Sequence, residues 1–144
     1  MINTDCEVIG VDNFSEEDSF GQIKFIKESL KKNFNNFSNN KHKFFENDYK
    51  IILKKLYEDK KKISFYYYDA GHSYEDHRDC LILAKDILTD DCIILIDDIG
   101  RKEVYEGTME GLKTFKNYEI LDYVKTIHPR HPTFWNGYIL IKLK

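Results

Sequence analysis

Hydrophobic and polar positions divide the chain into short apolar runs that alternate with amphipathic segments. Two continuous runs, Ile63–Tyr68 and Cys92–Ile96, flank a segment in which apolar residues recur at helical spacing. Continuous runs of this length are typical of strands buried on both faces of a parallel sheet. The pattern therefore predicts a parallel strand–helix–strand unit, and its helix buries one stripe, made of Leu81, Ala84, Ile87 and Leu88.

The same alternation continues on both sides of this central unit. Further strands are predicted at Glu7–Asp12, His42–Glu46, Tyr118–Ile127 and Tyr138–Leu143. Further helices are predicted over Phe20–Phe34, Tyr49–Tyr57 and Val104–Phe115, the first with a core-facing stripe of Phe20, Ile23, Ile26, Leu30 and Phe34. The polar segment Asn35–Lys41 is expected to be a loop, and Asp90-Asp91 a turn. Strands that alternate with helices predict an α/β fold with a doubly wound sheet.

Aspartates follow both strands of the central unit. Asp69 ends the first strand, and Asp97 and Asp98 end the second. Because parallel strands present their carboxyl ends at one edge, the three carboxylates are expected to converge there. Crowded like charges repel, and a divalent cation such as Mg²⁺, Mn²⁺ or Ca²⁺ removes that cost through oxygen ligands. The alternative is that they are solvated loop acids that end two strands.

Two more aspartates follow the earlier strands. Asp12 could bind both hydroxyls of a ribose, as acidic residues do in dinucleotide folds, or could form a turn with Asn13. Asp48 is expected to cap the helix that begins at Tyr49, and a ligand role could be added to this local one. Ser73, with Asp76 three residues later, approximates a capping box and predicts the start of the central helix.

The segment between the last two predicted strands is rich in large polar and aromatic side chains: His128, Arg130, His131, Phe134, Trp135 and Asn136. A tryptophan and a pair of histidines in a loop either line a pocket or close the end of a core. The sequence leaves both possibilities open.

Composition narrows the class of protein. A chain of 144 residues suits one domain, 1–144, and a net charge of −3 without a basic patch argues against a nucleic-acid partner. The three cysteines lack metal-binding spacing, which favours a reducing compartment. No apolar run has transmembrane length and no signal peptide is visible, so a cytoplasmic protein without a membrane partner is expected.

The order of strand-end acids, and above all the stretches YYYDAGHSYED and IILIDDIG, resembles the class I S-adenosylmethionine (SAM)-dependent methyltransferases. The resemblance is to the metal-dependent small-molecule O-methyltransferases, which include catechol O-methyltransferase and the macrolide sugar O-methyltransferases. It implies a Rossmann-like, mostly parallel sheet with an antiparallel last strand. It also implies SAM as cofactor and a small hydroxylated molecule or sugar as substrate.

The resemblance implies roles for individual residues. Asp69, Asp97 and Asp98 would bind Mg²⁺ or another divalent cation, which holds a substrate hydroxyl and lowers its pKa. Asp12 would bind the adenosine ribose and Asp48 the adenine. His72 stands where related sugar methyltransferases keep a general base, and it would take the hydroxyl proton before the oxygen attacks the methyl group.

The chain departs from this family at its start. The family begins with a strand and a glycine-rich loop that holds the methionine end of SAM, and this sequence contains no G-x-G-x-G. The sequence is therefore expected to be a fragment or reduced variant that lacks the usual first strand and binds SAM weakly. Unpaired strand edges could also pair with a second copy to form a homo-oligomer.

Two other classes of function remain open. The first is a non-catalytic remnant of a methyltransferase that acts as an interaction module. The second is a receiver-type phosphotransfer protein, although that class would place its aspartate pair after the first strand.

Overall fold

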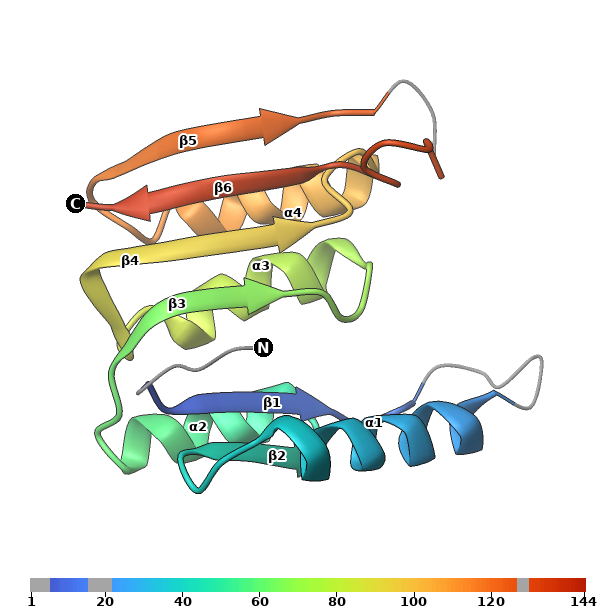
Figure 1. The fold of residues 1–144 in the computed structure, drawn as a ribbon. Helices are drawn as coiled ribbons and strands as arrows, with labels where there is room; N and C mark the ends of the chain where they lie inside the picture. Colours follow the sequence, from blue (N-terminus) through green and yellow to red (C-terminus); the bar gives the residue numbers. More distant parts are fainter. Residues whose placement is uncertain (1–5, 16–21, 127–129) are drawn as a thin grey trace. The chain divides into compact units, whose positions relative to one another are not determined.

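The computed structural model describes residues 6–15, 22–126 and 130–144, which form an α/β fold (Figure 1). The elements in chain order are β1 (Val8–Asp12), α1 (Ile23–Phe37), β2 (His42–Glu46), α2 (Tyr49–Glu58), β3 (Ile63–Tyr68), α3 (Tyr74–Ala84), β4 (Leu88–Asp97), α4 (Lys102–Leu112), β5 (Tyr118–Val124) and β6 (Tyr138–Leu143). They fall into two compact units, one up to Ile52 and one from Leu53 onward.

The first unit is built on the parallel pair of β1 and β2, in which Val8 pairs with His42 and Asp12 with Glu46. The two strands are joined through α1. None of the residues of α1 is buried. In the predicted stripe Ile23, Leu30 and Phe34 are half-buried and Ile26 is 47% exposed, so the stripe is only partly covered. Phe34 does contact Phe44 of β2, with ring centroids 6.5 Å apart. A two-stranded sheet offers too little apolar area to bury a whole helix face.

Two further expectations fall in this unit. The helix continues to Phe37, so the predicted loop Asn35–Lys41 is shorter than expected. Phe20, the first residue of the predicted stripe, lies outside the described residues.

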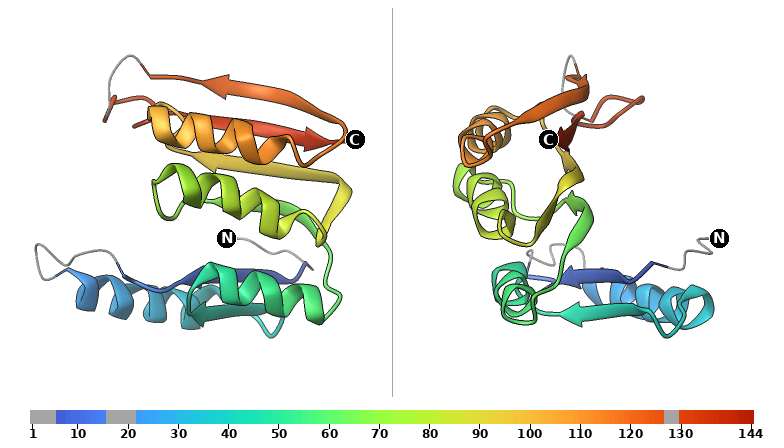
Figure 2. Two further views of the ribbon diagram at one scale, coloured as in Figure 1. Left: turned by 180° about the vertical axis from the view of Figure 1, so that it is seen from behind. Right: turned by 90° about the vertical axis from the view of Figure 1, so that its left-hand side faces the viewer.

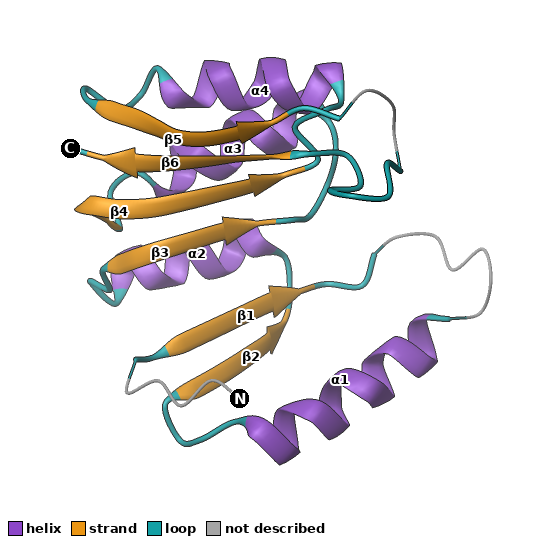
Figure 3. Cartoon of the chain, turned by 45° about the horizontal axis from the view of Figure 1, so that its top comes forward, coloured by secondary structure: helices purple, strands orange, loops and turns teal. Residues whose placement is uncertain are grey.

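The second unit contains a four-stranded sheet in the order β3-β4-β6-β5. The strands β3 and β4 are parallel, and β6 runs antiparallel to both of its neighbours, as Figure 3 shows by the opposite direction of its arrow. The two helices α3 and α4 pack on one face of this sheet (Figure 2). The predicted α/β class with an antiparallel last strand is confirmed.

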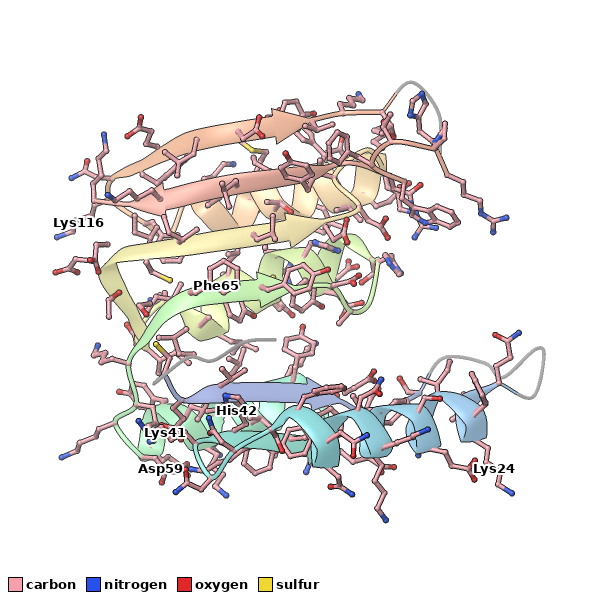
Figure 4. All side chains as sticks on the ribbon, viewed as in Figure 1. Lys24, Lys41, His42, Asp59, Phe65 and Lys116 are labelled. Atoms are coloured by element: carbon pink, nitrogen blue, oxygen red, sulfur yellow. The ribbon has the colours of Figure 1, made fainter. Side chains whose placement is uncertain are left out.

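The core of the second unit lies between the sheet and these two helices. Leu81 and Ala84 of α3 are fully buried, as predicted, together with Ile94 and Ile96 of β4. Gly107 brings the helices together, because a Cβ at this position would lie 2.2 Å from the carbonyl oxygen of Tyr74. The opposite face of β3 is open: Phe65, labelled in Figure 4, is 57% exposed.

Most predicted boundaries hold to within a few residues, with two clear errors. Ile87 and Leu88 are buried as expected but do not belong to the helix stripe, because α3 ends at Ala84 and Leu88 begins β4. Asp90-Asp91 do not form a turn but lie inside β4, where the pairing with β3 shifts register between Ile63 and Phe65. A bulge in the strand accommodates the two charges at positions that face solvent. Within the described residues, no helix has the length and hydropathy needed to cross a membrane.

Candidate functional site

The carboxyl ends of β3 and β4 bring two of the predicted site residues to one edge of the sheet. Tyr68 of β3 pairs with Ile96 of β4, so the residues that come next, Asp69 and Asp97, occupy matching positions at the carboxyl ends of the two strands. The hydroxyl of Tyr67 lies between them, 3.0 Å from Oδ2 of Asp69 and 3.1 Å from Oδ2 of Asp97. A phenol carries a single proton, so the hydroxyl donates to one carboxylate at a time.

Burial and, after it, the neighbouring negative charges shift two pKa values at this edge. Partial burial and the negative charges of Asp97 and Asp98 raise the pKa of Asp69, although the Tyr67 hydroxyl and His72 act in the opposite direction. Burial and the same acidic surroundings raise the pKa of Tyr67 well above its usual range. Tyr67 therefore remains a hydrogen-bond donor at neutral pH.

Asp98 is held differently from the other two aspartates. Its backbone has a left-handed φ of 57°, which short polar residues tolerate better than most, and its side chain is buried. Oδ1 accepts a hydrogen bond of 2.5 Å from Nδ2 of Asn136, and Oδ2 lies 2.6 Å from Nε2 of His72. Both carboxylate oxygens of Asp98 therefore have side-chain partners, whereas Oδ1 of Asp97 accepts from the backbone N–H of Asp98.

His72 precedes α3 in the loop that follows β3. The helix begins directly after it, because Ser73 caps α3 by accepting a 3.1 Å hydrogen bond from the backbone N–H of Asp76. Nε2 of His72 is the nitrogen that donates to Asp98, which leaves Nδ1 to accept a proton. The side chain is 32% exposed, so a small molecule can reach it.

The segment between β5 and β6 reaches this edge through Asn136. The backbones of His131 and Trp135 are joined by two hydrogen bonds of 2.8 and 2.9 Å, which close a short hairpin. The Asn136 carbonyl accepts from the N–H of Gly100 at 2.6 Å, and a Cβ on Gly100 would lie 2.3 Å from that oxygen. Asn136 itself is buried, and its side-chain oxygen accepts from the backbone of Arg130 at 2.9 Å.

The sequence left open whether this segment lines a pocket or closes a core, and the structure shows both. Asn136 packs inward against Asp98, whereas Phe134 and Trp135 line a pocket on the open face of the sheet. His128 lies outside the described residues.

A divalent metal ion fits the chemistry of these aspartates but not their present arrangement. Oxygen-only ligands suit a hard cation. However, Tyr67 occupies the space between Asp69 and Asp97, and Asp98 is committed to Asn136 and His72. Among the described residues, no three His, Cys, Asp or Glu side chains are placed to hold a metal ion.

The two predicted cofactor residues lie in the first unit, at the carboxyl edge of β1 and β2. Oδ1 of Asp12 accepts from the N–H of Phe14 at 2.7 Å, which makes the turn that the sequence left open as an alternative to ribose binding. Oδ1 of Asp48 accepts from the N–H of Lys50 at 2.8 Å, so the predicted cap of α2 is confirmed. The exposed Asp12 carboxylate fits a ribose, but the described residues of this unit include no glycine-rich turn for the methionine end of SAM.

The sequence did not indicate the role of Tyr67, and it singled out Asn136 without indicating its partner. Tyr67 was assigned only to an apolar strand, although residues two apart on a strand share a face, so its proximity to Asp69 could have been predicted. Asn136 carried no such signal, because its partner Asp98 lies 38 positions away in the chain.

Comparisons with known proteins agree with this fold. The family model for a methyltransferase domain matches residues 3–99. Among solved structures, the O-methyltransferase from Bacillus cereus in complex with S-adenosylhomocysteine (SAH) matches with a TM-score of 0.68 and 14% identity, over 96% of this chain and 63% of that one. No curated protein matches the chain.

Two further solved structures are similar. SMU.776 complexed with SAH matches with a TM-score of 0.66 and 11% identity, over 96% of this chain and 46% of its own. CalS11, a TDP-rhamnose 3'-O-methyltransferase of calicheamicin biosynthesis, matches with a TM-score of 0.55 and 18% identity, over 92% of this chain and 58% of its own. The chain thus spans less than two thirds of the length of each.

The family match covers more than half of the chain, and the fold is that of the Rossmann-like methyltransferases. The protein belongs to the methyltransferase-domain family.

Proposed function

We propose that this domain, residues 1–144, takes part in SAM-dependent methyl transfer to a hydroxyl group of a small molecule or sugar. The observation that carries the proposal is the pair of His72 and Asp98 at the exposed carboxyl edge of the four-stranded sheet. The similar structures support it, because two of them are O-methyltransferases and two contain SAH.

His72 acts in this proposal as the general base. Asp98 accepts a hydrogen bond from the Nε2–H group and so fixes the imidazole in the tautomer that presents a basic Nδ1. Nδ1 takes the proton of the acceptor hydroxyl as its oxygen forms the new C–O bond. The chemistry supplied by SAM, when bound, would be an electrophilic methyl group on a sulfonium whose sulfur would keep the electron pair of the C–S bond. No side chain forms a covalent intermediate.

The cofactor roles of Asp12 and Asp48 are part of the same proposal. Both residues lie at the carboxyl edge of a parallel strand pair, where ligands of α/β proteins commonly bind. In the structure, Oδ1 of Asp12 accepts the hydrogen bond of a turn, and Oδ1 of Asp48 accepts the hydrogen bond that caps α2. The second oxygen of Asp12, on an exposed side chain, is the one proposed to accept from the ribose hydroxyls.

The metal role of Asp69, Asp97 and Asp98 stays a prediction and is separate from the base mechanism. An ion between Asp69 and Asp97 would have to replace the Tyr67 hydroxyl. An ion that also uses Asp98 would have to displace Asn136 or His72. We therefore assign no catalytic step to the metal.

The experiment is a methyl-transfer assay with labelled SAM and hydroxylated small molecules. SAM is supplied at millimolar concentration so that cofactor binding does not limit the rate. His72→Gln should lower the rate about 100-fold or more, as expected for loss of a general base. His42→Gln, a histidine of β2, serves as the matched control and should keep the rate.

Two results would contradict the proposal. If His72→Gln kept the full rate of methyl transfer, His72 would not be the general base. Absence of transfer at saturating SAM, in wild-type protein shown to be folded, would favour the non-catalytic alternative.

A further inference from the structure

An open pocket of about 480 Å³ lies on the face of the four-stranded sheet opposite α3 and α4. Its floor consists of alternate strand residues, Leu95 of β4 and Leu140 of β6, whose chain neighbours are buried on the helix side. Its rim is the hairpin that contains Phe134 and Trp135, and Asp97 lies at its polar end.

The hairpin holds its two aromatic side chains in the open. Phe134 is 50% and Trp135 59% exposed, although both are large and apolar. The backbone beneath them is fixed by the paired N–H and carbonyl groups of His131 and Trp135, and by a 2.7 Å hydrogen bond from Gly137 to the Phe134 carbonyl. Trp135 also has a left-handed φ of 50°. Exposed apolar surface on a strained, well-anchored turn is typical of a binding site.

The side chains that line the pocket have a definite chemical character. Four are aromatic, namely Tyr67, Phe134, Trp135 and Tyr138, and the others are Leu95, Leu140, Thr133 and Asp97. Phe134 and Tyr138 meet edge to face with centroids 5.4 Å apart. Asp97 is the one charged residue among these described lining side chains, and none of them is basic.

Charge and shape together define the ligand. Aromatic walls favour a flat ring, and their negative faces attract positive charge. The Trp135 ring already has one such contact with a positive charge, because the Arg130 guanidinium lies 5.9 Å from the ring centroid. The Asp97 carboxylate accepts hydrogen bonds from hydroxyl groups and repels anions. A phosphate or carboxylate in this pocket would lack a basic partner among the lining residues.

We propose that this pocket binds the ring of a hydroxylated ligand that carries no negative charge. Phe134 and Trp135 contact the ring face, and Asp97 and Tyr67 bind its hydroxyl groups. That this ligand is the methyl acceptor rests on the proposed function, whereas the binding itself does not. A phenol and a sugar both offer a ring with hydroxyl groups and no negative charge, and the experiment distinguishes between these two kinds of ligand.

Trp135 makes the proposal directly measurable, because it is the sole tryptophan of the chain. Its fluorescence is titrated at low ionic strength and neutral pH with two charge-matched pairs of probes. The phenolic pair is tyramine and para-hydroxyphenylacetate, and the sugar pair is glucosamine and glucuronate. In at least one pair, the cation should change the Trp135 emission saturably and bind about tenfold or more tightly than the anion.

Three variants locate the effect. Phe134→Ala should abolish the saturable change, and Asp97→Asn should reduce the discrimination between cation and anion. Phe25→Ala, which removes a 70% exposed aromatic ring on α1, is the matched control and should change neither. Circular dichroism establishes that each variant is folded.

The proposal is overturned by an anion that binds as tightly as its cationic partner, by the absence of saturable change with all four probes, or by full binding in Phe134→Ala. Binding without methyl transfer would instead contradict the proposed function alone. Methyl transfer without binding of these probes would contradict the pocket assignment alone.

Discussion

The side-chain amide of Asn136 donates to the buried carboxylate of Asp98, with Nδ2 and Oδ1 2.5 Å apart. The other carboxylate oxygen of Asp98 holds His72. The side-chain oxygen of Asn136 accepts from the backbone of Arg130. A single buried side chain therefore links the hairpin that forms the pocket rim to the residue proposed as the base.

Asn136→Ala should destabilise the protein, because Asp98 would lose a hydrogen bond to a buried charge. The expected fall in the free energy of unfolding is about 2 kcal/mol, the typical value for a hydrogen bond to an ionised group. Urea denaturation followed by circular dichroism measures it. Asn117→Ala changes an exposed asparagine as the control and should stay within about 0.5 kcal/mol of wild type. Equal effects of the two substitutions would show that the Asn136 bond contributes little.

His77 should make the protein less stable in mild acid. Its ring packs edge-on against Tyr68 at 5.1 Å, and neither ring nitrogen has a hydrogen-bond partner among the described residues. Burial, with a smaller effect of His72, lowers the pKa of His77 from 6.5 to about 4. The unfolded chain therefore binds the proton more readily than the folded one, and stability is lost as pH falls from 6.5 towards 4.

His77→Phe tests this dependence. The substitution keeps a ring against Tyr68 but removes the titrating group, so unfolding free energy should depend less steeply on pH between 6.5 and 4. The difference in slope should add up to about 3 kcal/mol over this window. Acidic residues also titrate there, including Asp69 with its raised pKa, but they are common to both proteins. Parallel curves for the two proteins would mean that His77 is not buried as a neutral ring.

The metal prediction yields an unusual expectation for Tyr67→Phe. In wild type the Tyr67 hydroxyl lies between the carboxylates of Asp69 and Asp97. Its removal leaves two neighbouring negative charges without a shared donor, which a divalent cation would relieve. Mg²⁺ should therefore raise the melting temperature of Tyr67→Phe more than that of wild type.

The control for this experiment is the double variant that also carries Asp97→Asn, in which the additional rise should disappear. If Mg²⁺ leaves the melting temperature of both wild type and Tyr67→Phe unchanged, these aspartates do not bind the ion. Asp69 and Asp97 would then be acids that end two strands and have no metal role.

Local features of the sequence predicted much of this structure. The strands His42–Glu46, Ile63–Tyr68 and Tyr138–Leu143 begin and end where the apolar pattern does, and Ser73 caps α3 as expected. Because β3 and β4 pair in parallel, their carboxyl ends lie at the same edge of the sheet. Parallel pairing was enough to predict that Asp69 and Asp97 lie at that edge.

What the sequence could not supply depends on contacts between distant parts of the chain. Asp98 was grouped with its neighbour Asp97, but its left-handed backbone turns it towards Asn136 and His72. The apolar stripe of α1 indicated a core, yet the amount of burial depends on the partner surface, and this helix has no buried residue. Periodicity predicts which face of a helix is apolar, but it does not predict how much of that face other elements bury.

Asp98 is proposed to contribute to methyl transfer by holding His72, and a double-mutant cycle measures whether the two residues act together. The measured quantity is kcat/KM for His72→Gln, for Asp98→Asn and for the double variant, with one acceptor and saturating SAM. The double variant should lose about as much as His72→Gln alone, because residues that act as a unit have non-additive effects. Losses that multiply would contradict it and would show that Asp98 has a role independent of His72, as a metal ligand would.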